Sequence, residues 1–201
     1  MRKAIRHLKG CDPVLAGLIE RIGPYRIEYS PPNYQTLAKA IVLQQVSGKA
    51  AGRIFARLLA VAGDGELTPE RVLALEPWRL RQAGLSRQKV HYLRELAGRI
   101  ASGALDLREL EQLPDEEVMR RLTAIKGIGM WTVQMYLIFA LRRLDVLPSG
   151  DLGIRAAVRQ AYGHPELPPP REVERLAEPW RPYRSVASWY LWRSLEDQAG
   201  L

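Results

Sequence analysis

Asp151 is the residue with the clearest potential for chemistry, because it follows a Pro148-Ser149-Gly150 loop and precedes an apolar segment with helical spacing. A carboxylate at the start of a helix accepts backbone N–H groups at the positive end of the helix dipole, which favours its ionised form at neutral pH. Such a carboxylate can stabilise positive charge that develops during bond cleavage, and it can align or activate water. We therefore predict that Asp151 is catalytic. Asp145 is the alternative, but it lies before the loop and we expect it to cap a helix or to be solvated.

A second feature is a short Gly-x-Gly turn between two apolar segments with helical spacing. Two glycines so close disfavour a continuous helix and permit a sharp turn with positive φ. The helix that follows presents N–H groups and its positive dipole end near residues 129–132, where a phosphate oxygen fits. Ile128 is expected to anchor the turn in the core. We predict that a phosphodiester backbone is bound here by Lys126, Gly127, Ile128, Gly129 and Thr132.

The Gly-x-Gly turn has two other interpretations. A nucleotide-binding Gly-x-Gly-x-x-Gly loop would need a third glycine, where this chain has Thr132, and it would follow a strand and not a helix. A plain connection between helices would need only the two glycines. The longer string over residues 122–132, LTAIKGIGMWT, is more specific than the glycine pair and favours backbone binding.

Composition and charge narrow the class of protein. The chain has 201 residues, 47% of them hydrophobic and 26% charged, which suits a soluble globular protein of one unit or two small lobes. Its formal charge of +8 favours a polyanionic partner. No apolar stretch approaches the roughly 20 residues of a membrane span. The basic N-terminus has no apolar segment behind it, so we expect a bacterial-type cytoplasmic protein without membrane contact.

Cysteine and histidine usage argues against a metal held by side chains. Cys11 is the single cysteine, which excludes an intramolecular disulfide and an all-cysteine zinc or iron–sulfur site within one chain. The three histidines are scattered and lack the spacing of a ligand pair.

Apolar residues recur every three to four positions, with few alternating runs, and this pattern predicts an all-α protein. In the helix expected over residues 47–61, Lys49, Arg53 and Arg57 share one face. We predict that this face contacts an anionic partner, although a solvated basic face is the alternative. Further helices are expected over residues 13–22, 34–45, 87–102, 115–125, 152–162, 172–177 and 183–198, with Asp12, Asn33 and Ser86 near or at their starts.

Taken together, these strings resemble the helix–hairpin–helix motif of DNA repair glycosylases, in which a loop rich in glycine and proline and then an aspartate follow the hairpin. By these residues the chain is most similar to the 3-methyladenine DNA glycosylase II (AlkA-like) family. Two further stretches agree, namely residues 41–47 and residues 180–185 with Trp192, so the resemblance spans about residues 34–197. Lys126 stands where proline is common in the family.

The resemblance implies a single glycosylase unit over residues 1–201 with two helical lobes and a DNA-binding cleft between them. One lobe would comprise residues 34–143 and the other residues 1–33 with 144–201. It implies a monomeric, monofunctional hydrolase of base excision repair that binds double-stranded DNA, flips out an alkylated base such as 3-methyladenine and hydrolyses its N-glycosidic bond. Bifunctional relatives place a lysine two residues after the second glycine of the hairpin, where this chain has Trp131.

The resemblance also suggests roles for the remaining site residues. Gln45 matches the loop that fills the gap left by a flipped nucleotide, and Arg184 is a further candidate for phosphate contact. An electron-poor alkylated base should stack on electron-rich rings. The expected base pocket therefore contains Trp131, Trp192, Trp189 and Tyr34, and for Trp189 a place in the core is an equal alternative. A structural Na⁺ or K⁺ at the carbonyls of residues 125–129 is implied by the family alone, and no other cofactor is expected.

Two other functions stay open at this point. A non-catalytic helix–hairpin–helix DNA-binding module would need the hairpin and the basic face, but it would tolerate the loss of Asp151. A glycosylase for oxidised or deaminated bases would share every motif, because the shape of the pocket and not the motif selects the lesion.

Overall fold

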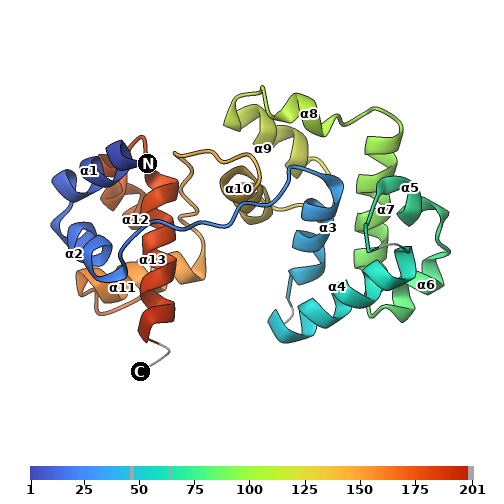
Figure 1. Ribbon diagram of the computed structural model, residues 1–201, viewed down its shortest axis with the longest axis horizontal. Helices are drawn as coiled ribbons and strands as arrows, with labels where there is room; N and C mark the ends of the chain where they lie inside the picture. The colour runs from blue at the N-terminus through green and yellow to red at the C-terminus, as the bar shows by residue number, and fades with distance from the viewer. Residues whose placement is uncertain (46–47, 64, 199–201) are drawn as a thin grey trace. The chain divides into compact units, whose positions relative to one another are not determined.

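The computed structural model of the chain describes residues 1–45, 48–63 and 65–198 (Figure 1). All regular elements in this part of the chain are helices, which confirms the predicted all-α class. The helices belong to two compact units, Met1–Tyr29 with Leu137–Leu201 and Ser30–Tyr136. Among the described residues, no helix combines the length and the apolarity that crossing a membrane requires.

The first unit is built around its C-terminal helix α13 (Arg184–Gln198), which contacts α2 (Pro13–Ile22) and α11 (Leu152–Tyr162). The unit also contains α1 (Arg2–Cys11), α12 (Pro170–Leu176) and the 3₁₀ turn η1 (Glu178–Trp180). Apolar side chains of these helices meet in one core, because α13 is buried on all sides over residues 185–191 and the helices around it turn their apolar faces toward it. Fully buried members of this core include Leu8, Leu15, Ile154, Val158 and Tyr190.

A buried carboxylate, Asp12, joins three elements of this unit. Its Oδ1 accepts the N–H groups of Val14 and Leu15 at 2.9 and 3.0 Å and so caps α2. Its Oδ2 accepts Trp180 Nε1 at 2.8 Å and the Tyr162 hydroxyl at 2.6 Å. Burial, together with the Asp12 carboxylate, raises the pKa of Tyr162, so its hydroxyl keeps the proton that it donates.

The second unit is organised around α7 (Arg87–Ala101), whose buried stripe includes Val90, Leu93 and Leu96. This helix contacts α3 (Tyr34–Leu43), α5 (Pro69–Ala74) and α6 (Pro77–Gln82). The remaining helices of the unit are α4 (Gly48–Ala62), α8 (Leu107–Leu110) and α9 (Asp115–Thr123). The last helix, α10 (Met130–Phe139), begins in this unit, and the chain passes to the first unit at residue 137.

The predicted helix starts agree with the structure where a side chain caps the helix. Asn33 accepts the N–H of Thr36, and Ser86 accepts that of Lys89. Helix α1 was not predicted. Its apolar residues Ala4, Ile5 and Leu8 do have helical spacing, and Ala4 and Leu8 are buried in the core of the unit.

Replacing Asp12 by alanine should destabilise the fold, because it removes a helix cap and leaves the indole N–H of buried Trp180 without an acceptor. We expect a loss of about 2 to 4 kcal/mol in the free energy of unfolding, measured by urea denaturation. Asp12→Asn, which keeps an acceptor oxygen for the cap, should lose less. A loss below about 1 kcal/mol in Asp12→Ala would contradict this role.

Candidate active site and nucleic-acid interface

The Gly-x-Gly turn connects α9 to α10 as the sequence predicted. Helix α9 ends at Thr123 and α10 begins at Met130. Gly127 has a φ of 87°, in the left-handed region that glycine adopts without a steric cost. The Ile128 side chain is 3% exposed, and its N–H donates to the carbonyl of Ile125 at 3.1 Å. Ile128 therefore anchors the turn in the core, as expected.

A second constraint on Gly127 comes from Tyr92 of α7. A Cβ added at Gly127 would lie 2.1 Å from Tyr92 Cδ2, far inside van der Waals contact. Gly129 is different, since a Cβ added there meets no atom within 4 Å among the described residues. The turn thus needs glycine at position 127 for its φ and for its close approach to Tyr92. No motif in the sequence pointed to Tyr92.

The loop that follows α3 is bonded to the hairpin through Gln44. Its Nε2 donates to the carbonyl oxygen of Gly127 at 2.8 Å and to the Thr132 hydroxyl at 3.2 Å. Thr132 is 2% exposed. The prediction that this hydroxyl contacts a phosphate is therefore corrected, because a buried hydroxyl that accepts from Gln44 holds the α3 loop in place.

Gln45 is the next residue, and its backbone is strained. Its φ of 54° lies in the left-handed region, which non-glycine residues seldom adopt. Its side chain is exposed. Val46 and Ser47, which belong to the same sequence motif, lie outside the described residues, and so does the side chain of Lys49.

The other basic residues predicted to bind DNA are exposed in the second unit. Arg53 and Arg57 lie on α4, and Lys126 lies in the hairpin turn. Arg57 also donates from Nε to the carbonyl of Ala83 at 3.1 Å, so part of its guanidinium is used at the end of α6. Lys126 and Arg53 remain the simplest candidates for phosphate contact.

Asp151 is the N-cap of α11 in the first unit. Its Oδ1 accepts the N–H of Ile154 at 2.8 Å and the Nε1–H of Trp192 at 2.9 Å. The loop before it is also held, because the Ser149 hydroxyl donates to Glu174 Oε1 at 2.7 Å. These contacts fix both the place and the orientation of the carboxylate at the positive end of the helix.

Trp192 is positioned by two further residues. Its ring stacks on Phe139, with ring centroids 5.8 Å apart and planes at 28°. A Cβ added at Gly153 would lie 3.2 Å from Trp192 Cδ1 and 3.0 Å from Asp151 Oδ1, so the first turn of α11 passes close beneath both side chains. Phe139 was missed by the sequence analysis, because nothing in its local pattern separates it from core residues of α10.

Two of the predicted pocket aromatics are core residues, and this corrects the sequence analysis. Trp189 is 8% exposed, and its ring lies 4.8 Å from Tyr25 and 4.9 Å from Tyr190 between centroids. Tyr34 is 4% exposed, its hydroxyl donates to the Leu93 carbonyl at 3.0 Å, and burial raises its pKa. A base needs an open ring face to stack on. Trp131, by contrast, is 44% exposed in the first turn of α10.

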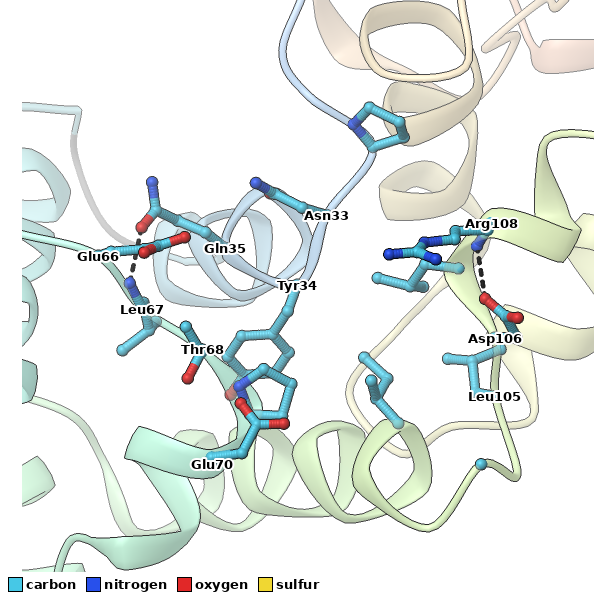
Figure 2. Close-up of a pocket in the computed structure, with 15 residues that line it drawn as sticks. Asn33, Tyr34, Gln35, Glu66, Leu67, Thr68, Glu70, Leu105, Asp106 and Arg108 are labelled. Atoms are coloured by element: carbon cyan, nitrogen blue, oxygen red, sulfur yellow. Dashed lines mark hydrogen bonds between the residues drawn. The ribbon is translucent and has the colours of Figure 1, made fainter.

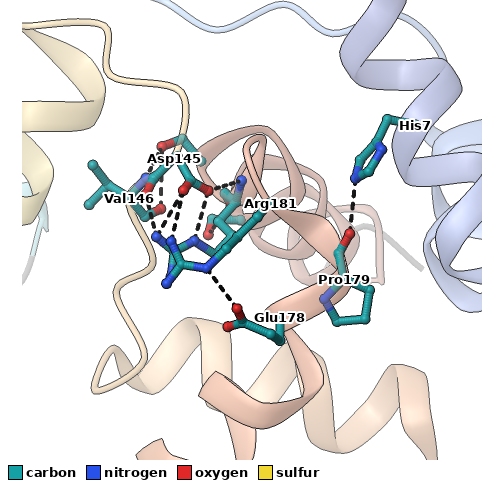
Figure 3. Close-up of polar contacts among 9 residues, drawn as sticks. His7, Asp145, Val146, Glu178, Pro179 and Arg181 are labelled. Atoms are coloured by element: carbon teal, nitrogen blue, oxygen red, sulfur yellow. Dashed lines mark hydrogen bonds and ion pairs between the residues drawn. The ribbon is translucent and has the colours of Figure 1, made fainter.

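Arg184 also receives a different role from the one predicted. Its Nε donates to Asp145 Oδ1 at 2.7 Å, and its Nη2 donates to Asp145 Oδ2 at 3.0 Å. The Arg184 side chain is only 16% exposed. Figure 3 shows that Arg181 also reaches Asp145, and it pairs with Glu178 as well. Because Arg184 forms this bidentate ion pair, it is structural. Asp145, the alternative catalytic carboxylate, is held by both arginines.

A cavity of about 460 Å³ lies elsewhere in the second unit, beside the ring of Tyr34 (Figure 2). Its polar lining includes Asn33, Gln35, Glu66, Glu70, Asp106 and Arg108. Apart from Tyr34, it contains none of the predicted site residues.

An all-helical fold, a glycine hairpin before α10 and a capped aspartate after a Pro-Ser-Gly loop are together the features of helix–hairpin–helix DNA repair proteins. Comparison with known families agrees. The family described as "HhH-GPD superfamily base excision DNA repair protein" matches residues 38–182. The chain belongs to this superfamily.

Individual relatives are similar over nearly the whole chain. DNA-3-methyladenine glycosylase 1 of Schizosaccharomyces pombe is 38% identical over 200 residues, which cover 96% of this chain and 87% of the relative. A solved structure of the 3-methyladenine DNA glycosylase of that yeast with abasic DNA has a TM-score of 0.88 and covers 96% of this chain and 97% of its own. A DNA-3-methyladenine glycosidase from Bacillus halodurans, 36% identical, also has a TM-score of 0.88 and covers 98% and 91%.

The two hairpin glycines provide a matched pair of substitutions. Gly127→Ala should destabilise the protein by more than about 1 kcal/mol and weaken its binding to duplex DNA, because of the positive φ and the contact with Tyr92. Gly129→Ala should change stability little. Thermal unfolding and fluorescence anisotropy with a labelled duplex measure both effects. Equal behaviour of the two variants would refute the geometry described for Gly127.

Proposed function

We propose that this protein is a monofunctional DNA glycosylase that removes alkylated bases of the 3-methyladenine type during base excision repair. The observation that carries the proposal is the carboxylate of Asp151, oriented by the N–H groups of Ile154 and Trp192 at the start of α11. The superfamily membership and the names of the similar proteins support the same activity.

The chemistry of the reaction needs a single carboxylate. The glycosidic bond is out of reach inside the base stack, so the nucleotide must first be flipped out. Cleavage then develops positive charge on the deoxyribose, as it does in sugar hydrolysis generally. The anionic side chain of Asp151 stabilises that charge and aligns the attacking water. An alkylated purine already carries a positive charge, so it leaves without protonation by a general acid.

The aromatic residues suit such a substrate. Trp192 has an electron-rich ring adjacent to the carboxylate, supported from one side by Phe139. A cationic base is attracted to the face of an indole by about 0.5 to 2 kcal/mol. Trp131 offers a second exposed ring on α10, and it occupies the position at which bifunctional relatives carry the lyase lysine.

The hairpin supports a double-stranded DNA partner, and we propose that the protein binds it as a monomer. Helix α10 begins directly after the hairpin, so the positive end of its dipole lies at the turn, and Lys126 adds an exposed positive charge there. Damage in the duplex would be recognised through flipping, since a weakened pair costs less to open.

A monovalent cation, Na⁺ or K⁺, is part of this proposal. The hairpin offers carbonyl oxygens, which are suitable ligands for such ions. Those of Ile125 and Gly127 accept hydrogen bonds from Ile128 and from Gln44, and a carbonyl oxygen has two lone pairs with which it can also face a cation. A bound cation would add positive charge next to the DNA phosphate.

Replacing Asp151 by asparagine should abolish most of the activity and leave DNA binding intact. We expect the single-turnover release of 3-methyladenine from a duplex to fall by about 10²-fold or more, because the stabilising charge is lost. Asp145→Asn is the matched control, and it should retain the rate as long as the protein stays folded. If the unmodified protein releases no base from duplexes with alkylated, oxidised or deaminated lesions, the non-catalytic binding module becomes the better function.

Trp192→Phe tests the orientation of the carboxylate. The ring that stacks on Phe139 is kept, but the Nε1–H donor to Asp151 is lost, so the single-turnover rate should fall about tenfold while affinity for the duplex is unchanged. Trp189→Phe is the control, because Trp189 lies in the core. It should lower stability and not the rate. A larger loss of rate in Trp189→Phe than in Trp192→Phe would reverse our assignment of the two residues.

A further inference from the structure

One face of α7 supports both the hairpin and the loop that follows α3. Lys89 Nζ donates to the carbonyl oxygens of Val42 and Gln44, each at 2.7 Å. Tyr92, three residues further on the same face, is the side chain that lies against Gly127. Two neighbouring side chains of a single helix therefore contact the two loops to which the sequence assigned DNA contacts.

Lys89 donates hydrogen bonds to carbonyl groups at the C-terminal end of α3. That helix has no basic residue in its own last turn, and the carbonyls there carry partial negative charge. The ammonium group of Lys89 has three donors and uses two of them on these carbonyls. The side chain is half-buried, and desolvation lowers the pKa of Lys89.

Gln44 joins this helix end to the hairpin. Its main-chain carbonyl accepts from Lys89, while its side-chain amide donates to the carbonyl of Gly127 and to Thr132. The next residue, Gln45, has a φ of 54° and an exposed side chain. A strained backbone persists only where its surroundings determine it. Here the main-chain bond from Lys89 to Gln44 and the side-chain bonds of Gln44 to the hairpin hold the neighbouring backbone of Gln45 in place.

We propose that Lys89 and Gln44 are positioning residues that fix Gln45 relative to the hairpin before DNA binds. The side chain that fills the gap of a flipped nucleotide and the turn that grips the backbone then act as one preformed unit. Without Lys89 or the Gln44 amide, the loop must be ordered during flipping, and this lowers the population of the flipped state. The inference rests on the proposed glycosylase function and on the role of Gln45.

The decisive comparison uses two substrates that differ in the cost of flipping. One duplex carries 3-methyladenine opposite thymine, and the other carries it opposite an abasic site, where no pair has to be broken. Lys89→Met and Gln44→Met should lower the single-turnover rate on the paired duplex by about 10- to 100-fold. On the unpaired duplex we expect less than about a threefold change, because flipping there needs little help.

Two further variants serve as controls. Lys89→Arg keeps a cation with several donors and should restore most of the paired-duplex rate. Lys39→Met removes an exposed charge from α3 without touching either loop, and it should behave as the unmodified protein. Thermal unfolding shows that each variant is folded at the assay temperature.

A second readout follows flipping without cleavage. In the Asp151→Asn background, 2-aminopurine next to the lesion should brighten on binding of the paired duplex, and Lys89→Met should reduce this signal. An equal loss of rate on both substrates, or no loss on the paired one, would overturn the positioning role. If the unmodified protein cleaves neither substrate, the proposed function fails. If it also gives no flipping signal, the positioning role fails with it.

Discussion

An α-helix leaves the N–H groups of its first turn and the carbonyls of its last turn without partners inside the helix, and this deficit shapes both functional regions. At the start of α11, Asp151 accepts an N–H and is held at the positive end of the dipole. At the end of α3, Lys89 supplies the donors that the helix lacks. At the start of α10, the carbonyl of Gly129 in the glycine turn accepts the N–H of Val133. An all-helical protein thus builds its site from helix ends.

Net charge by itself overestimates the surface available for DNA. Of the basic residues considered, Arg184 and Arg181 are bound to Asp145, and Arg57 donates to the end of α6. An arginine that is held by a carboxylate has fewer N–H donors left for a phosphate. The +8 charge favours approach to a polyanion, and among the residues predicted to contact DNA, Lys126 and Arg53 have exposed side chains.

The geometry around Asp151 suits a leaving group that is already activated. The carboxylate is oriented by two donors on one oxygen, and the adjacent indole is braced by Phe139. Such a site can stabilise a cation at fixed distance, and it has no need to tune a second carboxyl as a general acid. A site without a general acid favours substrates whose base leaves readily. This is the physical reason for expecting alkylated purines.

Local patterns in the sequence were sufficient for the all-α class, the hairpin, the cap at Asp151 and several helix starts. These features depend on residues a few positions apart, whose preferences act within one turn of the chain. The same patterns misassigned Tyr34, Trp189, Thr132 and Arg184, since residue type does not show whether a side chain faces the core or already has a partner. Three contacts of the site join residues that are far apart in the sequence. Tyr92 and Gly127 are 35 positions apart, and Phe139 and Trp192 are 53 apart. Lys89 is 47 and 45 positions from the two carbonyls at the end of α3 that it binds. Only the packing of the helices brings such groups together, because the buried faces of whole helices, and not any short motif, decide which side chains meet.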